Sequence, residues 1–125
     1  EHLGAYLNEF IALVESYHLT YTVAGHLGNG NLHFIPLMDF SRSETRETIF
    51  KLMPEVYKLV KKYDGTMSAE HNDGLIRTPF LRDMFGQSMA LIFKELKEIF
   101  DPENIFNPGK KTGTTLNQAQ LLINT

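Results

Sequence analysis

The feature that most constrains this chain is an Asn-Gly pair between two short segments of strand-forming residues. Residues 19–24 (LTYTVA) and 32–37 (LHFIPL) are rich in β-branched and aromatic side chains, which favour strands. Asn29 and Gly30 lie between them, and Asn-Gly in such a setting is the strongest short-range signal of a β-hairpin. The sequence therefore predicts an antiparallel hairpin over about residues 19–37.

Three other stretches repeat apolar residues at helical spacing, within residues 3–18, 49–63 and 89–100. Pro54 should kink the second helix or define its first turn, because proline lacks an N–H group. After Lys111 the periodicity is weak, and no regular element is predicted. Strands joined as a hairpin favour an α+β fold, with an antiparallel sheet covered by amphipathic helices.

Composition excludes several classes of protein. The chain has 125 residues, a length typical of one domain, and its net charge of −3 argues against a basic nucleic-acid-binding surface. It has no cysteine, so disulfides, Cys-ligated zinc and Fe–S clusters within these residues are excluded. No apolar run approaches the roughly 18 residues of a membrane span. We therefore expect no nucleic-acid partner and no transmembrane segment.

The hairpin register brings two histidines together. If Asn29 and Gly30 form a two-residue turn, or if residues 28–31 form a four-residue loop, His26 lies directly across from His33. Opposed residues point to the same face with Cβ atoms about 4.5–5.5 Å apart. Two imidazoles at that separation can share one metal ion.

A third ligand is predicted in a polar turn. Glu70 lies between Gly65 and Gly74, where a carboxylate can reach a neighbouring strand end. Two histidines and a carboxylate leave positions open for substrate, as in catalytic metal sites, and they suit zinc, manganese or iron. The same residues are also compatible with an ordinary polar hairpin and a solvated turn. The loop with Gly28 and Gly30 is compatible with a phosphate cradle.

Three motifs occur in an order and spacing that resemble one enzyme family. They are GHLGNGNLH at residues 25–33, SAEHNDG at residues 68–74 and FDPENIFNPGKK at residues 100–111. Together they resemble the C-terminal domain of FAD-linked oxidases, a group that includes D-lactate dehydrogenase, D-2-hydroxyglutarate dehydrogenase and the flavin-dependent component of glycolate oxidase. The likeness spans about residues 20–111.

This resemblance implies a flavoenzyme that oxidises a small 2-hydroxy acid, such as D-lactate or glycolate, with the help of a divalent metal, zinc or manganese. It implies that His26, His33 and Glu70 bind the metal. It also implies that His71 contacts the substrate and is the catalytic acid–base group.

Two further residues are candidates for binding. Arg77 is a candidate for substrate binding, with a surface or helix-start role as the alternative. Asn107, in a turn of the third motif, is a candidate for cofactor binding.

The chain departs from the family pattern at three positions. Asn29 stands where the family pattern has aspartate, and Asn72 stands where it has glycine. Both changes lie in loops and leave the ligands intact. Ile35 stands where D-2-hydroxyglutarate dehydrogenases carry a substrate-binding asparagine. That difference counts against a dicarboxylate substrate.

The resemblance also predicts how the chain is organised and what it works with. Residues 1–111 would be the substrate and metal portion, and residues 112–125 a tail, with flexibility as one possibility. FAD would be held mainly by an N-terminal FAD-binding domain of the same protein that this chain lacks, so the isolated chain should be inactive. An electron-acceptor protein or Fe–S protein is a further expected partner. We expect a cytoplasmic location, with membrane association through a partner left open.

Two other functions remain compatible with the same residues. One is a metal-dependent hydrolase that uses His26, His33 and Glu70 around an activated water. The other is a non-catalytic, metal-stabilised module that docks onto another domain.

Overall fold

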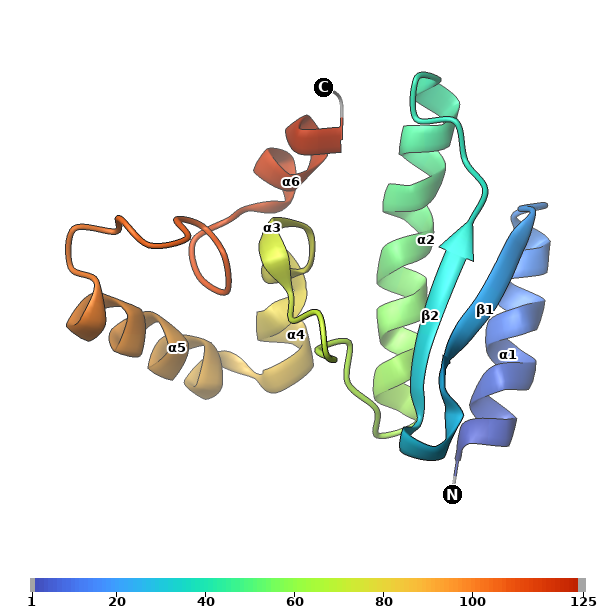
Figure 1. Ribbon diagram of the computed structural model, residues 1–125, viewed down its shortest axis with the longest axis horizontal. Coiled ribbons are helices and arrows are strands. Elements are labelled where there is room, and N and C mark those ends of the chain that lie inside the picture. Colours follow the sequence, from blue (N-terminus) through green and yellow to red (C-terminus); the bar gives the residue numbers. More distant parts are fainter. Residues whose placement is uncertain (1, 124–125) are drawn as a thin grey trace. The chain divides into compact units, whose positions relative to one another are not determined.

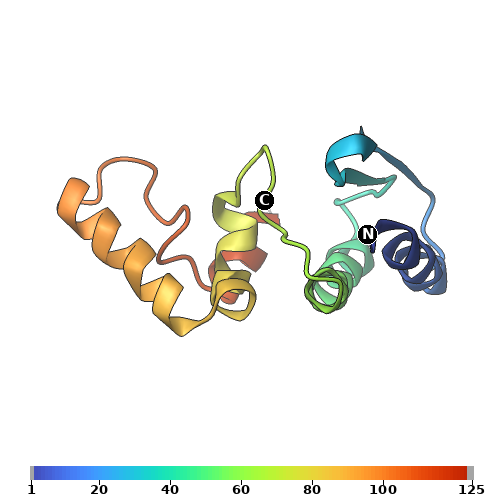
Figure 2. The ribbon, with the colours of Figure 1, turned by 90° about the horizontal axis from the view of Figure 1, so that it is seen from below.

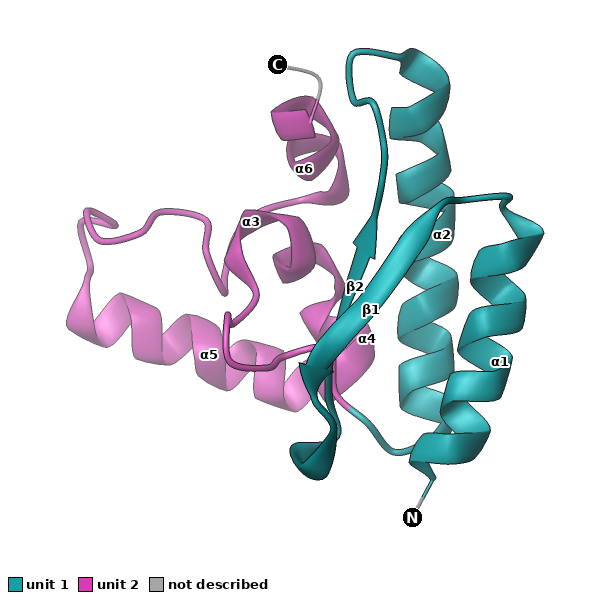
Figure 3. Cartoon of the chain, turned by 45° about the vertical axis from the view of Figure 1, so that its right-hand side comes forward, with its two compact units in different colours: residues 1–65 teal, residues 66–125 magenta. Residues whose placement is uncertain are grey.

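The computed structural model describes residues 2–123. The chain divides into unit 1, Glu1–Gly65, and unit 2, Thr66–Thr125, which Figure 3 shows in two colours. Unit 1 combines an antiparallel hairpin with helices, whereas the elements of unit 2 are helices. The predicted α+β fold with an antiparallel hairpin is therefore confirmed.

Unit 1 has two layers. Two helices lie side by side in one layer, and the two-stranded hairpin forms the other (Figures 1 and 2). In chain order the elements are α1 (Leu3–Ser16), β1 (Tyr21–His26), the 3₁₀ turn η1 (Leu27–Asn29), β2 (Asn31–Pro36) and α2 (Ser43–Lys62). α2 continues through Pro54, so this proline does not define the first turn of the helix.

The core of unit 1 lies between the hairpin and the helices. At its centre are Phe10, Val14 and Leu59, and the strand residues packed against them are Tyr21, Val23 and Phe34. These strand residues share one face, because successive side chains in a strand point to opposite faces and Val23 pairs with Phe34. The opposite face therefore carries the alternate residues, including His26 and His33.

Replacing Phe10 with alanine should destabilise unit 1 by about 3–5 kcal/mol, the usual cost of truncating a buried phenylalanine. Phe10 is 3% exposed, and its ring contacts that of Phe34 edge-to-face, with centroids 5.3 Å apart. Ile11, the next residue of α1, is 38% exposed, so Ile11→Ala should cost about 1 kcal/mol or less. Urea unfolding of the two variants measures the difference, and equal costs would contradict this description of the core.

The predicted hairpin register is wrong by two residues. His26 pairs with Asn31 and His33 pairs with Ala24, so the two histidines are not directly opposed. The loop consists of four residues, 27–30, in which the Gly30 N–H donates to the Leu27 carbonyl. A type I′ turn needs positive φ at both Asn29 and Gly30, and only Gly30 has it. The chain forms a 3₁₀ turn that ends in a left-handed glycine, which moves the pairing by two positions.

Among the described residues of unit 2, the regular elements are helices and one 3₁₀ turn. They are α3 (Gly74–Arg77), the 3₁₀ turn η2 (Thr78–Phe80), α4 (Leu81–Phe85), α5 (Gln87–Phe100) and α6 (Leu116–Ile123). The expectation of no regular element after Lys111 was wrong, because α6 forms there and its Ala119 is fully buried. Residue 1 and the last two residues of the predicted tail, 124 and 125, lie outside the described residues.

A buried carboxylate organises the loop after α5. Asp101 accepts hydrogen bonds from the N–H groups of Ile105 (2.8 Å) and Phe106 (2.9 Å), and its side chain pairs with the ammonium of Lys97. The hydrogen bond from Lys97 is the main reason why the pKa of Asp101 lies below its ordinary value. This loop belongs to the third motif, which ends at Lys111.

Among residues 2–123, no helix combines the length and the apolar character that a membrane span requires.

Candidate metal and acid–base site

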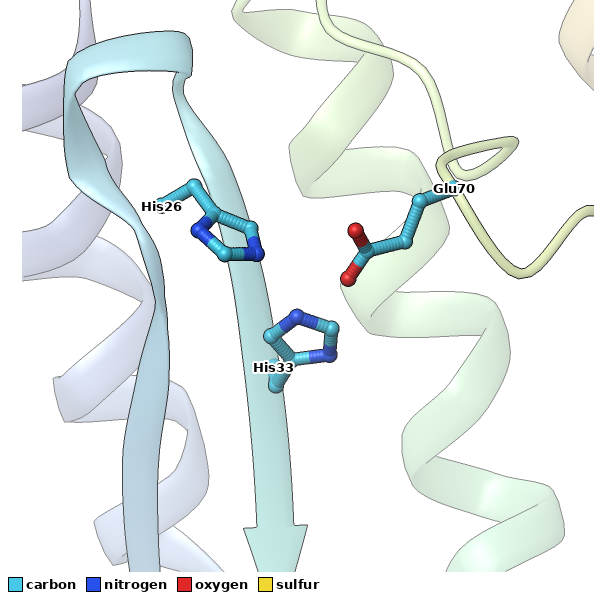
Figure 4. A group of neighbouring side chains, drawn as sticks. All are labelled: His26, His33 and Glu70. Carbon is cyan, nitrogen blue, oxygen red and sulfur yellow. The ribbon is translucent and has the colours of Figure 1, made fainter.

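His26 and His33 lie on the same face of the hairpin, opposite to the core. His26 ends β1, and its pairing partner Asn31 is two residues from His33, which makes the histidines diagonal neighbours. Their ring centroids are 6.1 Å apart and the ring planes form an angle of 78°. Figure 4 shows both imidazoles on one side of the hairpin. A shift of two residues preserves the face of a strand residue, so the two rings remain neighbours.

Gly25 allows the strands to approach each other next to His26. Its φ is +134°, a region that favours glycine. A Cβ atom at this position would lie 2.2 Å from the carbonyl oxygen of Asn31, the residue that pairs with His26. The position of His26 therefore depends on a glycine directly before it.

Gly25→Ala should destabilise the hairpin by about 2 kcal/mol or more, because it adds both backbone strain and a clash with backbone atoms. Gly28→Ala is the matched control. No atom lies within 4 Å of its hypothetical Cβ, so its effect should stay below about 1 kcal/mol. Chemical denaturation measures both values. A Gly25→Ala protein as stable as the Gly28→Ala protein would contradict the geometry described for Gly25.

Glu70 and His71 form the tip of a turn in unit 2. The Asn72 N–H closes this turn by donating to the Ala69 carbonyl (2.9 Å). The Nε2 atom of His71 lies 3.4 Å from Oε1 of Glu70, and the two side chains are 70% and 40% exposed. Asn72 has a φ of 55°, a left-handed conformation that asparagine adopts more readily than most residues. Asparagine can therefore occupy the place where the family pattern has glycine.

His26 and His33 of unit 1 each offer an imidazole nitrogen as a ligand atom, and Glu70 of unit 2 offers a carboxylate oxygen. Two imidazoles and a carboxylate are a donor set that zinc, manganese and iron accept. The predicted residues thus have a donor chemistry that fits a divalent metal.

The Arg77 side chain forms hydrogen bonds with the backbone around the turn of Glu70 and His71. Its Nη1 atom donates to the carbonyl oxygens of Met67 (3.0 Å) and Asn72 (2.8 Å), on either side of the Glu70–His71 tip. Contact with substrate, proposed from the sequence, stays a prediction.

Asn107 is in a left-handed conformation with a φ of 48°. Its side-chain oxygen accepts a hydrogen bond from Nζ of Lys110 (3.0 Å), and its carbonyl accepts one from the Lys110 N–H (3.1 Å). Its role towards a cofactor also stays a prediction.

Sequence reasoning missed two residues, Asp73 and Lys111, which lie beside the turn that carries Glu70 and His71. Asp73 is 4% exposed although it lies in a run of polar residues, and Lys111 donates to its Oδ2 atom (2.6 Å). Nothing in the local sequence indicates that this aspartate is buried. The one signal in the sequence was the position of Lys111 at the end of the third motif, which by itself indicates only a turn.

Comparison with known proteins agrees with the motifs. A family described as FAD linked oxidases, C-terminal domain, matches residues 1–111. D-2-hydroxyglutarate dehydrogenase from Escherichia coli (strain K12) is 34% identical over 110 residues, which are 88% of this chain and 11% of that protein.

Two other relatives carry related names. Glycolate oxidase subunit GlcD from Bacillus subtilis (strain 168) is 31% identical over 98 residues, 78% of this chain and 21% of that protein. A probable mitochondrial D-lactate dehydrogenase from Danio rerio is 32% identical over 95 residues, 76% of this chain and 19% of that protein. The chain thus spans 11–21% of the length of these three relatives. Because the family match extends over residues 1–111, the chain belongs to the family of FAD-linked oxidase C-terminal domains.

Proposed function

We propose that this chain is the metal- and substrate-binding part of an FAD-dependent dehydrogenase that oxidises a small 2-hydroxy acid. The observation that carries the proposal is the pair of His26 and His33 imidazoles on one face of the hairpin, with ring centroids 6.1 Å apart, to which the second motif adds the carboxylate of Glu70. Two of the three sequence motifs supply these residues. The names of the relatives, which include D-lactate dehydrogenase and a component of glycolate oxidase, support the reaction class.

His26, His33 and Glu70 would hold the metal and leave coordination positions open for the substrate. A divalent ion bound there would lower the pKa of a hydroxyl group in contact with it. The paired strands of the hairpin hold the two imidazoles on one face, and the hydrogen-bonded turn holds the carboxylate. These residues would therefore orient the hydroxyl group of the substrate.

His71 is proposed as the base. Oxidation of a 2-hydroxy acid to a 2-oxo acid removes the hydroxyl proton while the α-hydrogen leaves with its electron pair as hydride. Imidazole suits the proton transfer because it exchanges protons near neutral pH. The contact with Glu70 keeps the ring next to the proposed metal ligand, and its side chain is 70% exposed. Bound FAD would accept the hydride.

Ile35 supports a substrate with a single carboxylate. It follows His33 by two residues, so it lies on the same face of β2, and it is 51% exposed. Isoleucine offers no hydrogen-bond donor for a second carboxylate, but it can contact a short alkyl group such as the methyl of D-lactate. We therefore propose D-lactate or glycolate as the substrate class.

FAD is proposed to bind mainly to an N-terminal domain of the same protein. This is supported by the family description, which names a C-terminal domain of FAD-linked oxidases, and by relatives that are much longer than this chain. Asn107 is the candidate contact of this chain with the cofactor. An electron-acceptor protein or Fe–S protein is proposed as the partner that reoxidises the flavin.

The full-length gene product should carry flavin, and anaerobic D-lactate or glycolate should bleach the flavin absorbance. The 125-residue chain alone should be colourless and should not reduce a dye with either acid, because hydride transfer needs the flavin. Near-stoichiometric flavin on the isolated chain would show that the cofactor site has been misplaced. A flavin-containing full-length protein that no 2-hydroxy acid reduces would contradict the proposed reaction.

A further inference from the structure

We propose that Lys111 is a positioning residue for the turn that carries Glu70 and His71. The inference rests on the proposed metal site. Lys111 is the last residue of the third sequence motif, and it would hold in place the turn of the second motif. All contacts that carry it lie within unit 2.

The two flanks of the turn are tied to each other. Glu70 and His71 lie between Ala69 and Asn72, which close the turn through a backbone hydrogen bond. Immediately outside, the Ser68 hydroxyl donates to Oδ1 of Asp73 (2.5 Å). The Asp73 carboxylate therefore fixes the width of the turn.

Lys111 holds this carboxylate from a distant part of the chain. Its Nζ atom donates to Oδ2 of Asp73 (2.6 Å) and to Oδ1 of Asn72 (3.3 Å). The Asp73 side chain is 0% exposed, whereas that of Lys111 is 35% exposed. A carboxylate removed from water is stable only when it is paired and hydrogen-bonded. Asp73 therefore depends on Lys111, which lies 38 residues further along the chain.

Both the backbone and the side chain of Lys111 have partners in unit 2. Its backbone N–H donates to the Thr78 hydroxyl (2.8 Å), which in turn donates to the Gly74 carbonyl (2.5 Å). Its ammonium lies 5.0 Å from the ring centre of Phe93 and 5.9 Å from that of Phe85, within the range of cation–π attraction. Figure 1 shows the segment after α5 returning towards α3. The backbone and the ammonium of Lys111 thus both have contacts within unit 2.

Loss of Lys111 should loosen the turn without abolishing it. Arg77 still donates hydrogen bonds to the carbonyl groups of Met67 and Asn72. These two hydrogen bonds should preserve the local conformation of the turn. The variant loses the ion pair between Asp73 and Lys111. Without this ion pair, the Glu70 carboxylate should be placed less precisely. Groups that orient a metal ligand from outside the coordination shell are typically worth about 10–100-fold in metal affinity. For a residue acting through Asp73 we expect the lower end of that range.

The test measures Mn²⁺ and Zn²⁺ affinity of the full-length gene product by competition with a chelating dye. Lys111→Met should weaken binding about 10-fold, while Lys111→Arg, which keeps the charge, should retain most of the affinity. Lys110→Met is the matched control and should bind as the unmodified protein does, because the Lys110 ammonium donates to Asn107 in the third motif. In a Glu70→Ala background, Lys111→Met should cause no further loss, because its effect passes through Glu70.

If Lys111→Met does not fold, the Asp73→Asn/Lys111→Met variant removes both charges of the pair and should fold with the same loss of affinity. Unchanged affinity in folded Lys111→Met protein, or an equal loss with and without Glu70, would overturn the positioning role alone. Metal binding by the unmodified protein that does not depend on His33 would overturn the proposed metal site, and the role of Lys111 with it.

Discussion

Replacing His33 with alanine is expected to lower the affinity of the full-length protein for Mn²⁺ or Zn²⁺ by more than about 100-fold, since even residues outside the coordination shell are worth about 10–100-fold. His33 supplies one of two imidazoles whose ring centroids are 6.1 Å apart, and its loss would leave only two of the three proposed ligands, His26 and Glu70. Equilibrium dialysis with metal analysis, or competition with a chelating dye, measures the change.

His18→Asn is the matched control for this experiment. His18 is also a histidine of unit 1, it has no proposed role, and asparagine tolerates its positive φ of 53°. The control variant should bind metal as the unmodified protein does. If His33→Ala and His18→Asn bind the metal equally well, the hairpin does not provide the metal site.

Replacing His71 with asparagine is expected to slow flavin reduction in the full-length enzyme by about 10²–10⁴-fold, the usual contribution of a general base. Asparagine has a similar size but cannot accept the hydroxyl proton at neutral pH. Because His71 is not among the three proposed ligands, the variant should retain both metal and flavin.

Anaerobic stopped-flow mixing with D-lactate or glycolate gives the rate of flavin reduction directly. Metal and flavin contents, measured on the same samples, separate a lost base from a lost cofactor. A near-normal rate in the His71→Asn enzyme would remove His71 from the mechanism. A low rate accompanied by loss of metal would assign it to the metal site instead.

The hairpin shows what local sequence signals can and cannot predict. Strand-forming residues around Asn29 and Gly30 were sufficient to predict the hairpin, which the structure confirms. They were not sufficient for the register, because the backbone conformation of Asn29 decides between a type I′ turn and a 3₁₀ turn. The error was two residues, and side chains alternate with a period of two. His26 and His33 therefore still share a face.

Contacts between distant segments were harder to predict. The α6 helix buries Ala119, but its sequence shows only weak periodicity, so tertiary packing rather than local pattern accounts for it. Likewise, the burial of Asp73 depends on Lys111, and no local signal marks such a pair. The candidate ligands were accessible from sequence because their motifs resemble those of a family. The network that supports them became visible only in three dimensions.

The central claim is that His26, His33 and Glu70 hold one divalent metal ion. A crystal structure of the full-length protein with Mn²⁺ or Zn²⁺, with anomalous data collected at the absorption edge of the metal, tests it most directly. We predict one strong anomalous peak at about 2.0–2.2 Å from a nitrogen of each imidazole and an oxygen of Glu70. Imidazoles that point to opposite faces of the hairpin, or a peak bound by other residues, would contradict the claim.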